Sequence, residues 1–248
     1  MKDKALTGRL RMTDVSHYYG SMQVIEHLDL VVQPGEVVML VGPSGCGKST
    51  ILNLISGHIQ PSAGSIHREG IIRTVYQSSG LFPWLTVSEN IKMGLRSLPD
   101  HHQIEMELKE LIELVHLDGF DHHYPHQLSG GMRQRVELAR VLAGDSDILL
   151  MDEPFSALDY QARLRMRSEL VRILKQQPRT VVFVTHDIEE AAQLADRVLV
   201  LSPRPATILL ELRIDTARPR GLTDQSVIEA MNEILTALGL HTGTELTS

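Results

Sequence analysis

The chain has 248 residues, 42% of them hydrophobic, and a formal net charge of −7 at pH 7. These values are typical of a globular protein with one large or two small domains, and the negative charge argues against a broad nucleic-acid-binding surface, which needs a basic stripe. No run approaches the ~18 apolar residues of a membrane span, and residues 1–4 lack the apolar segment of a signal peptide. Because a single cysteine also excludes an internal disulfide, these features predict a cytosolic protein.

Strand patterns alternate with helix patterns over most of the chain, which predicts an α/β fold with a parallel sheet. The predicted strands lie at residues 28–32, 37–41, 65–66, 71–75, 147–151, 180–184 and 197–201. A helix is predicted over 160–176, and apolar residues at helical spacing from Val227 to Leu238 predict a packing helix near the C-terminus.

The segment from residue 81 to residue 143 has a different pattern, and we expect it to be an inserted helical subdomain. Thr86 and Glu89 have the spacing of a capping box, which predicts the start of a helix. A second, amphipathic helix is predicted over Ile104–Leu117. Ser129 is the expected cap of a third helix that runs to about Ala143.

The most informative motif follows the predicted strand at residues 37–41. It matches the phosphate-binding pattern G-x-x-x-x-G-K-[ST], and its glycines allow backbone N–H groups to approach phosphate oxygens. Lys48 is expected to reach the β- and γ-phosphates, and Ser49 Oγ is expected to bind Mg²⁺. The expected nucleotide-contacting residues of this loop and helix start are Gly42, Pro43, Ser44, Gly45, Cys46, Gly47, Lys48, Ser49 and Thr50.

Two carboxylates end the apolar strand predicted near residue 150. Asp152 is a candidate for holding Mg²⁺ through water, and Glu153 is a candidate general base for the attacking water. The alternative is that both acids are simply a polar strand end. Next to a phosphate-binding loop, we favour the catalytic interpretation.

A third motif, Leu-Ser-Gly-Gly at residues 128–131, precedes the Asp-Glu pair by about twenty residues, and this order and spacing resemble the signature of ATP-binding cassette (ABC) ATPases. Serine and glycines at a helix start offer a second anion site. The resemblance, which covers roughly residues 10–215, implies that Ser129, Gly130 and Gly131 close on the ATP held by another subunit. Met132 departs from the glutamine of many members and cannot donate an amide hydrogen bond to the opposite ribose.

The same resemblance implies roles for four further residues. Tyr19 matches the aromatic residue that stacks on adenine, and Gln77 matches the glutamine that reaches Mg²⁺ and links hydrolysis to the partner. Asp159, in Ser-Ala-Leu-Asp at 156–159, matches a loop at the dimer interface. His186 matches the switch histidine that contacts the γ-phosphate.

Cysteine and histidine side chains are further chemical candidates. Cys46 lies inside the phosphate-binding loop, where we expect a thiol that alkylates and is protected by MgATP; the alternative is that it points into the core. Histidines 101, 102, 122, 123 and 126 have no cysteine or paired acid at zinc spacing, so we interpret them as solvated loop residues rather than metal ligands.

The resemblance implies a single ABC ATP-binding domain of P-loop, RecA-like type. Its core would lie at about 1–80 and 144–215, its helical signature subdomain at about 81–143, and a C-terminal helical extension at about 216–248. The signature variant with Met132 and the segments at residues 81–87 and 201–205 resemble those of the ATPases of nitrate, sulfonate and taurine importers. They include Phe82 and Trp84, which would form either a groove for a permease helix or subdomain core.

The implied function is the ATPase subunit of an importer for a small, anionic solute. It would use ATP and Mg²⁺, form a homodimer, bind a separate membrane permease at the cytoplasmic face of the inner membrane and serve a solute-binding protein indirectly. Export is the less favoured direction. A soluble cassette for iron–sulfur assembly is the main alternative, while DNA-repair and translation-factor cassettes need coiled-coil or zinc modules, or a second cassette, that 248 residues do not hold.

Overall fold

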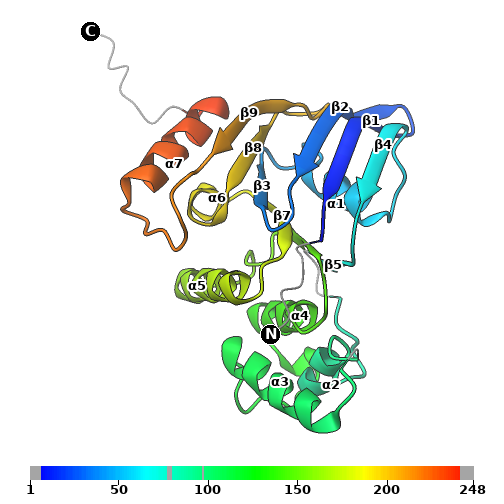
Figure 1. Ribbon diagram of the computed structural model, residues 1–248, viewed down its shortest axis with the longest axis vertical. Coiled ribbons are helices and arrows are strands. Elements are labelled where there is room, and N and C mark those ends of the chain that lie inside the picture. Colours follow the sequence, from blue (N-terminus) through cyan, green and yellow to red (C-terminus); the bar gives the residue numbers. More distant parts are fainter. Residues whose placement is uncertain (1–6, 77–79, 97, 241–248) are drawn as a thin grey trace. The chain divides into compact units, whose positions relative to one another are not determined.

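The computed structural model describes residues 7–76, 80–96 and 98–240. It divides the chain into two compact units, one of residues 1–69 with 180–248 and the other of residues 70–179 (Figure 1). We refer to them as the first unit and the second unit. The boundaries predicted for an inserted helical subdomain, about residues 81 and 143, stay a prediction.

The first unit begins with an antiparallel sheet in the order β2-β1-β4. Its strands are β1 (Leu10–Tyr19), β2 (Met22–Val32) and β4 (Ala63–Arg68). Leu10 is opposite Val32 on one side and opposite Arg68 on the other, and Tyr19 pairs with Met22 at the β1–β2 hairpin.

The first unit also holds a buried parallel set of strands, in which β3 lies between β7 and β8. These strands are β3 (Val37–Val41), β7 (Thr180–Thr185) and β8 (Arg197–Leu201), with β9 (Ile208–Arg213) antiparallel to β8. All residues of β3, β7 and β8 are buried, as expected of apolar strands covered on both faces. Val41 is opposite both Thr185 and Val200, so the carboxyl ends of the three strands meet at one edge.

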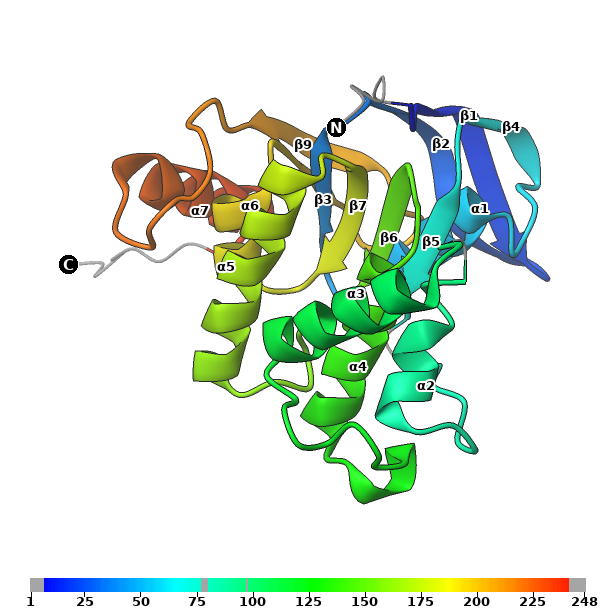
Figure 2. The ribbon, with the colours of Figure 1, turned by 60° about the horizontal axis from the view of Figure 1, so that its bottom comes forward.

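The helices in the described part of the first unit are α1 (Lys48–Ser56), α6 (Ile188–Leu194) and α7 (Gln225–Ala237). Helix α7 buries Val227, Ala230 and Ile234, which share one face at helical spacing. It packs beside α6, as both views show (Figures 1 and 2).

The described residues of the second unit form a parallel strand pair and four α-helices. Its elements are β5 (Ile72–Val75), α2 (Val87–Lys92), α3 (His101–Leu114), the 3₁₀ turn η1 (Pro125–Gln127), α4 (Gly130–Leu142), β6 (Ile148–Asp152) and α5 (Tyr160–Gln176). The expected caps are present: Thr86 and Glu89 make a capping box on α2, and Ser129 Oγ accepts a hydrogen bond from Met132 N at the start of α4.

The α/β fold with a parallel sheet agrees with the prediction, with several local differences. Helix α3 starts at His101, earlier than predicted, because Asp100 caps it through His102 N; His101 and His102 are therefore helical rather than loop residues. Strands β1 and β9 and helix α6 were not predicted. Within the described ranges, every helix is too short or too polar to span a membrane.

Candidate nucleotide-binding site

The phosphate-binding loop predicted from the sequence leaves β3 at Val41 and enters α1 at Lys48. Gly45 (φ 75°) and Gly47 (φ 125°) have left-handed backbone conformations that favour glycine. A Cβ added to Gly47 would lie 3.1 Å from Val24 Cγ1, so a larger residue there would require Val24 of β2 to shift. The loop is thus shaped by its glycines, while Pro43, Ser44 and Gly45 remain exposed.

Positive charge is concentrated at this loop. Lys48 is 7% exposed, and its Nζ donates to the carbonyl oxygens of Gly42 (2.7 Å) and Pro43 (3.0 Å), which holds the ammonium against the loop. Helix α1 has no side-chain cap on Gly47 and no acidic residue in its first turn, so nothing there offsets the positive end of its dipole. Ser49 is exposed in the same turn. These features fit the polyphosphate of a nucleotide.

The Cys46 thiol does not face solvent. The residue is only 2% exposed, and its Sγ would lie 3.1 Å from a Cβ on Gly42, so the sulfur fills space inside the loop. The structure therefore agrees with the alternative of a buried thiol rather than the expected accessible one.

Two further predicted residues lie in the first unit. His186 directly follows β7, and because Thr185 is opposite Val41, His186 and Gly42 leave neighbouring strands at the same edge; His186 is exposed. Tyr19 ends β1 with 46% of its surface exposed, and its ring makes an edge-to-face contact with His17, with centroids 4.8 Å apart. That contact limits the orientations that the Tyr19 ring can adopt.

In the second unit, Asp152 ends β6 and Glu153 follows it. Asp152 is 9% exposed. Glu153 has φ 48°, a left-handed conformation that is strained for a residue with a side chain. The Glu153 carbonyl accepts hydrogen bonds from Gln134 Nε2 (3.0 Å), Ser156 Oγ (2.9 Å) and Ser156 N (3.1 Å), which together fix this conformation.

Gln134 on α4 is a residue that our sequence analysis missed. It is 5% exposed, and while its Nε2 holds the Glu153 carbonyl, its Oε1 accepts from Ala157 N at 3.0 Å. One amide side chain therefore spans the loop after β6. The available signal was a polar residue on the buried face of an amphipathic helix, together with Leu138 and Val141.

The Leu-Ser-Gly-Gly motif forms the N-terminus of α4 as predicted. Ser129 and Gly130 are exposed, whereas Gly131 packs closely: a Cβ there would lie 3.0 Å from the Ala157 carbonyl oxygen. Asp159 caps α5 by accepting from Ala162 N at 2.9 Å. This hydrogen bond is the main reason that the pKa of Asp159 is lowered.

Gln77 lies outside the described residues, but a buried acid holds the chain on either side of it. Glu137 on α4 accepts from Tyr76 N (3.3 Å) and Gly80 N (3.0 Å). Burial raises the pKa of Glu137, although these hydrogen bonds and the nearby Arg140 oppose the shift. Glu137 is a second residue that the sequence analysis missed.

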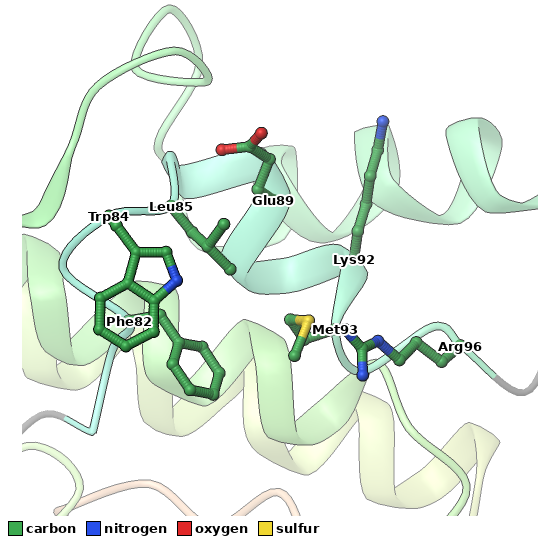
Figure 3. A pocket seen from close by; sticks show the side chains of 7 residues that line it. All are labelled: Phe82, Trp84, Leu85, Glu89, Lys92, Met93 and Arg96. Carbon is green, nitrogen blue, oxygen red and sulfur yellow. The ribbon is translucent and has the colours of Figure 1, made fainter.

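A groove of about 500 Å³ lies on the second unit beside α2 (Figure 3). Trp84 is 69% exposed and its ring lies 5.6 Å from that of Phe82, so the alternative that Trp84 is core is wrong. The residues that line the groove are Phe82, Trp84, Leu85, Glu89, Lys92, Met93 and Arg96.

A glycine loop between a buried parallel strand and an uncapped helix, with a buried lysine held against it, defines a P-loop nucleotide-binding protein of α/β class. Residues 25–156 match the family model described as ABC transporter. The chain is 43% identical over 235 residues to the aliphatic sulfonates import ATP-binding protein SsuB 1 of Rhodococcus jostii, covering 92% of this chain and 93% of the relative. It is 39% identical over 236 residues to SsuB of Bacillus thuringiensis, covering 90% and 93%.

Among solved structures, a dimeric ATP-binding cassette in a post-hydrolysis state, bound to ADP and Pi, matches with a TM-score of 0.75 and 28% identity, over 84% of this chain and 100% of that one. The chain belongs to the ABC transporter family.

Proposed function

We propose that this protein is the ATP-hydrolysing subunit of an importer, and that it energises uptake of a small anionic solute, such as a sulfonate, taurine or nitrate, through a separate permease. The observation that carries the proposal is the P-loop, in which Lys48 Nζ is held on the loop carbonyls beside an uncapped helix start. The class of solute rests on the relatives named as sulfonate importers. No observation favours the iron–sulfur alternative.

The first unit supplies most of the nucleotide contacts in this proposal. Backbone N–H groups of residues 42–50 bind phosphate oxygens, Lys48 supplies charge to the β- and γ-phosphates, and Tyr19 stacks on adenine. Ser49 Oγ and the Asp152 carboxylate are hard oxygen donors of the kind that Mg²⁺ prefers, and Gln77 adds an amide oxygen. These donors fit Mg²⁺, which would neutralise phosphate charge when bound.

Glu153 is the proposed general base. Its carboxylate accepts a proton from the water that attacks the γ-phosphate, while His186 contacts that phosphate. The hydrogen bonds to its carbonyl support this role because they fix the backbone that carries the carboxylate. Positioning of this kind accounts for a large share of catalysis in phosphoryl transfer.

We further propose a homodimer in which the exposed start of α4, Ser129 to Gly131, closes on the nucleotide of the other copy, with Asp159 at the interface. The exposure of Ser129 and Gly130 supports this proposal. The groove at Phe82 and Trp84 would receive the permease at the cytoplasmic face of the membrane, and a solute-binding protein would deliver the solute to that permease. Aromatic residues such as the exposed Trp84 are enriched at protein interfaces.

The test is ATP hydrolysis by the subunit assembled with its permease and binding protein in proteoliposomes. Sulfonate, taurine or nitrate should stimulate hydrolysis and enter the vesicles. Lys48→Ala should weaken ATP binding about a hundredfold and abolish uptake, because it removes the positive charge that binds the phosphates while the apolar core stays unchanged. Unstimulated hydrolysis with each of these anions would contradict the proposed solute class, and unchanged ATP binding by Lys48→Ala would contradict the P-loop assignment.

A further inference from the structure

The turn between β8 and β9 carries an arginine beside the P-loop. Arg204 Nη2 lies 3.8 Å from the position that a Cβ on Gly45 would occupy, at the exposed part of the loop. Arg204 Nη1 donates to Met22 Sδ at 3.1 Å, and Met22 is the strand partner of Tyr19. The guanidinium therefore lies between the phosphate-binding loop and the hairpin that carries Tyr19.

Hydrogen bonds fix the turn that carries this arginine. Thr207 N donates to Ser202 Oγ (2.9 Å), and that hydroxyl lies within hydrogen-bonding distance of the carbonyl oxygens of Pro203 (2.8 Å) and Pro205 (3.0 Å). Ala206 N donates to Val24 O (2.8 Å), and Ala206 O accepts from Glu26 N (3.2 Å). The turn is thus attached to β2.

The P-loop packs against the same strand and turn. A Cβ on Gly47 would lie 3.1 Å from Val24 Cγ1 and 3.7 Å from Ala206 Cβ. The location of Arg204 relative to the P-loop is therefore set by packed backbone rather than by side-chain contacts alone.

The charge of Arg204 is not compensated by this arrangement. A thioether is a weak hydrogen-bond acceptor, and within the described residues no carboxylate forms an ion pair with Arg204. A guanidinium is a planar, always charged donor whose geometry matches phosphate oxygens. Beside a phosphate-binding loop, the groups that such a cation can bind are the phosphates of the nucleotide.

We propose that Arg204 is an additional nucleotide-binding residue, which donates to the phosphate chain at the end nearer the ribose. Its location on the Tyr19 side of the loop selects that end, since Tyr19 is the proposed adenine contact. The inference rests on the proposed function, because it assumes that a nucleotide occupies the P-loop.

Binding of ADP and ATP to the purified chain, measured by calorimetry at low ionic strength, tests this proposal. Arg204→Ala and Arg204→Met should each weaken both affinities about tenfold, because each removes one charged donor. Arg204→Lys should retain part of the affinity. Arg213→Ala, which removes an exposed arginine from β9, is the matched control and should bind like the wild type.

The outcomes separate the two proposals. If Lys48→Ala loses nucleotide affinity and Arg204→Ala does not, Arg204 is not a ligand and this inference is wrong. If Arg204→Met binds ADP and ATP like the wild type, the aliphatic part of the side chain rather than the guanidinium charge supports binding, and the inference is also wrong. If Lys48→Ala also binds normally, the proposed function itself fails. Thermal unfolding of every variant checks that the fold is intact.

Discussion

Glu153 is held in a left-handed conformation by donors from two directions, the α4 side chain of Gln134 and Ser156, three residues further along the chain. Strain at a single residue persists only where surrounding contacts determine it, and such residues concentrate at functional sites. Gln134 is accordingly a positioning residue, because it acts on the proposed base through the base's backbone.

We predict that Gln134→Ala lowers the ATP turnover rate by about tenfold or more while leaving MgATP affinity within about twofold, because a misplaced base costs rate rather than binding. Steady-state phosphate release and calorimetry measure the two quantities. Gln103→Ala, on the exposed face of α3, is the control and should match the wild type. A change in affinity without a change in turnover would contradict the positioning role.

Residue positions were predictable from the sequence where a motif carries its own geometry. The glycine loop predicted the place of Lys48, and the Leu-Ser-Gly-Gly pattern predicted the cap at Ser129. The burial of Cys46 was not predictable, because it depends on how the loop folds back on itself. The hydrogen bond of Gln134 to the Glu153 carbonyl was not predictable either, because the two residues lie far apart along the chain.

Helix ends in this protein are set by short polar side chains. Asp100, Ser129, Asp159 and Asp187 each accept a hydrogen bond from a backbone N–H in the first turn of the helix that follows. The cap at Asp159 also titrates: its hydrogen bond to Ala162 N lowers the pKa of the Asp159 carboxyl from its ordinary value of 3.8. A lowered pKa stabilises the folded state above 3.8, and this contribution is lost as the pH falls through the folded pKa.

Asp159→Asn should therefore make the free energy of unfolding less dependent on pH in the acid range. Asparagine still caps α5 but carries no charge, so the variant should be less stable than the wild type near pH 7, and the difference should shrink as the pH falls below 4. Urea unfolding of the isolated chain between pH 7 and pH 3 measures this difference in the free energy of unfolding. A difference that is constant across this range would show that the charge of Asp159 does not contribute.

The elements with the clearest patterns were predicted, whereas the missed strands β1 and β9 have interrupted or weak patterns. The parallel strands β3, β6, β7 and β8 are short apolar runs and α5 has clear helical spacing, so all were found within a residue or so. Strand β1 was missed because its register shifts between Met12 and Val15, where Asp14 has φ 52°, and this interrupts the alternation. Strand β9 is only half-buried, so the alternation of apolar and polar residues in its sequence is weak.

At the scale of the whole molecule, the proposed roles are divided between the two units. The P-loop, Tyr19 and His186 belong to the first unit, while Asp152, Glu153 and the start of α4 belong to the second. Hydrolysis as proposed requires residues of both. The order of the motifs along the sequence predicted the family, but it carries no information on the spatial arrangement of the motifs.

The claim that this chain binds MgATP and hydrolyses it with Glu153 as base is tested most directly by comparing wild type and Glu153→Gln in two measurements, MgATP binding and phosphate release. The amide keeps the shape of the side chain and loses the base. The variant should therefore bind MgATP at least as tightly as the wild type and release phosphate about a hundredfold more slowly, or slower still. Glu229→Gln on α7 is the control and should turn over normally. Turnover by Glu153→Gln near the wild-type rate would contradict the account.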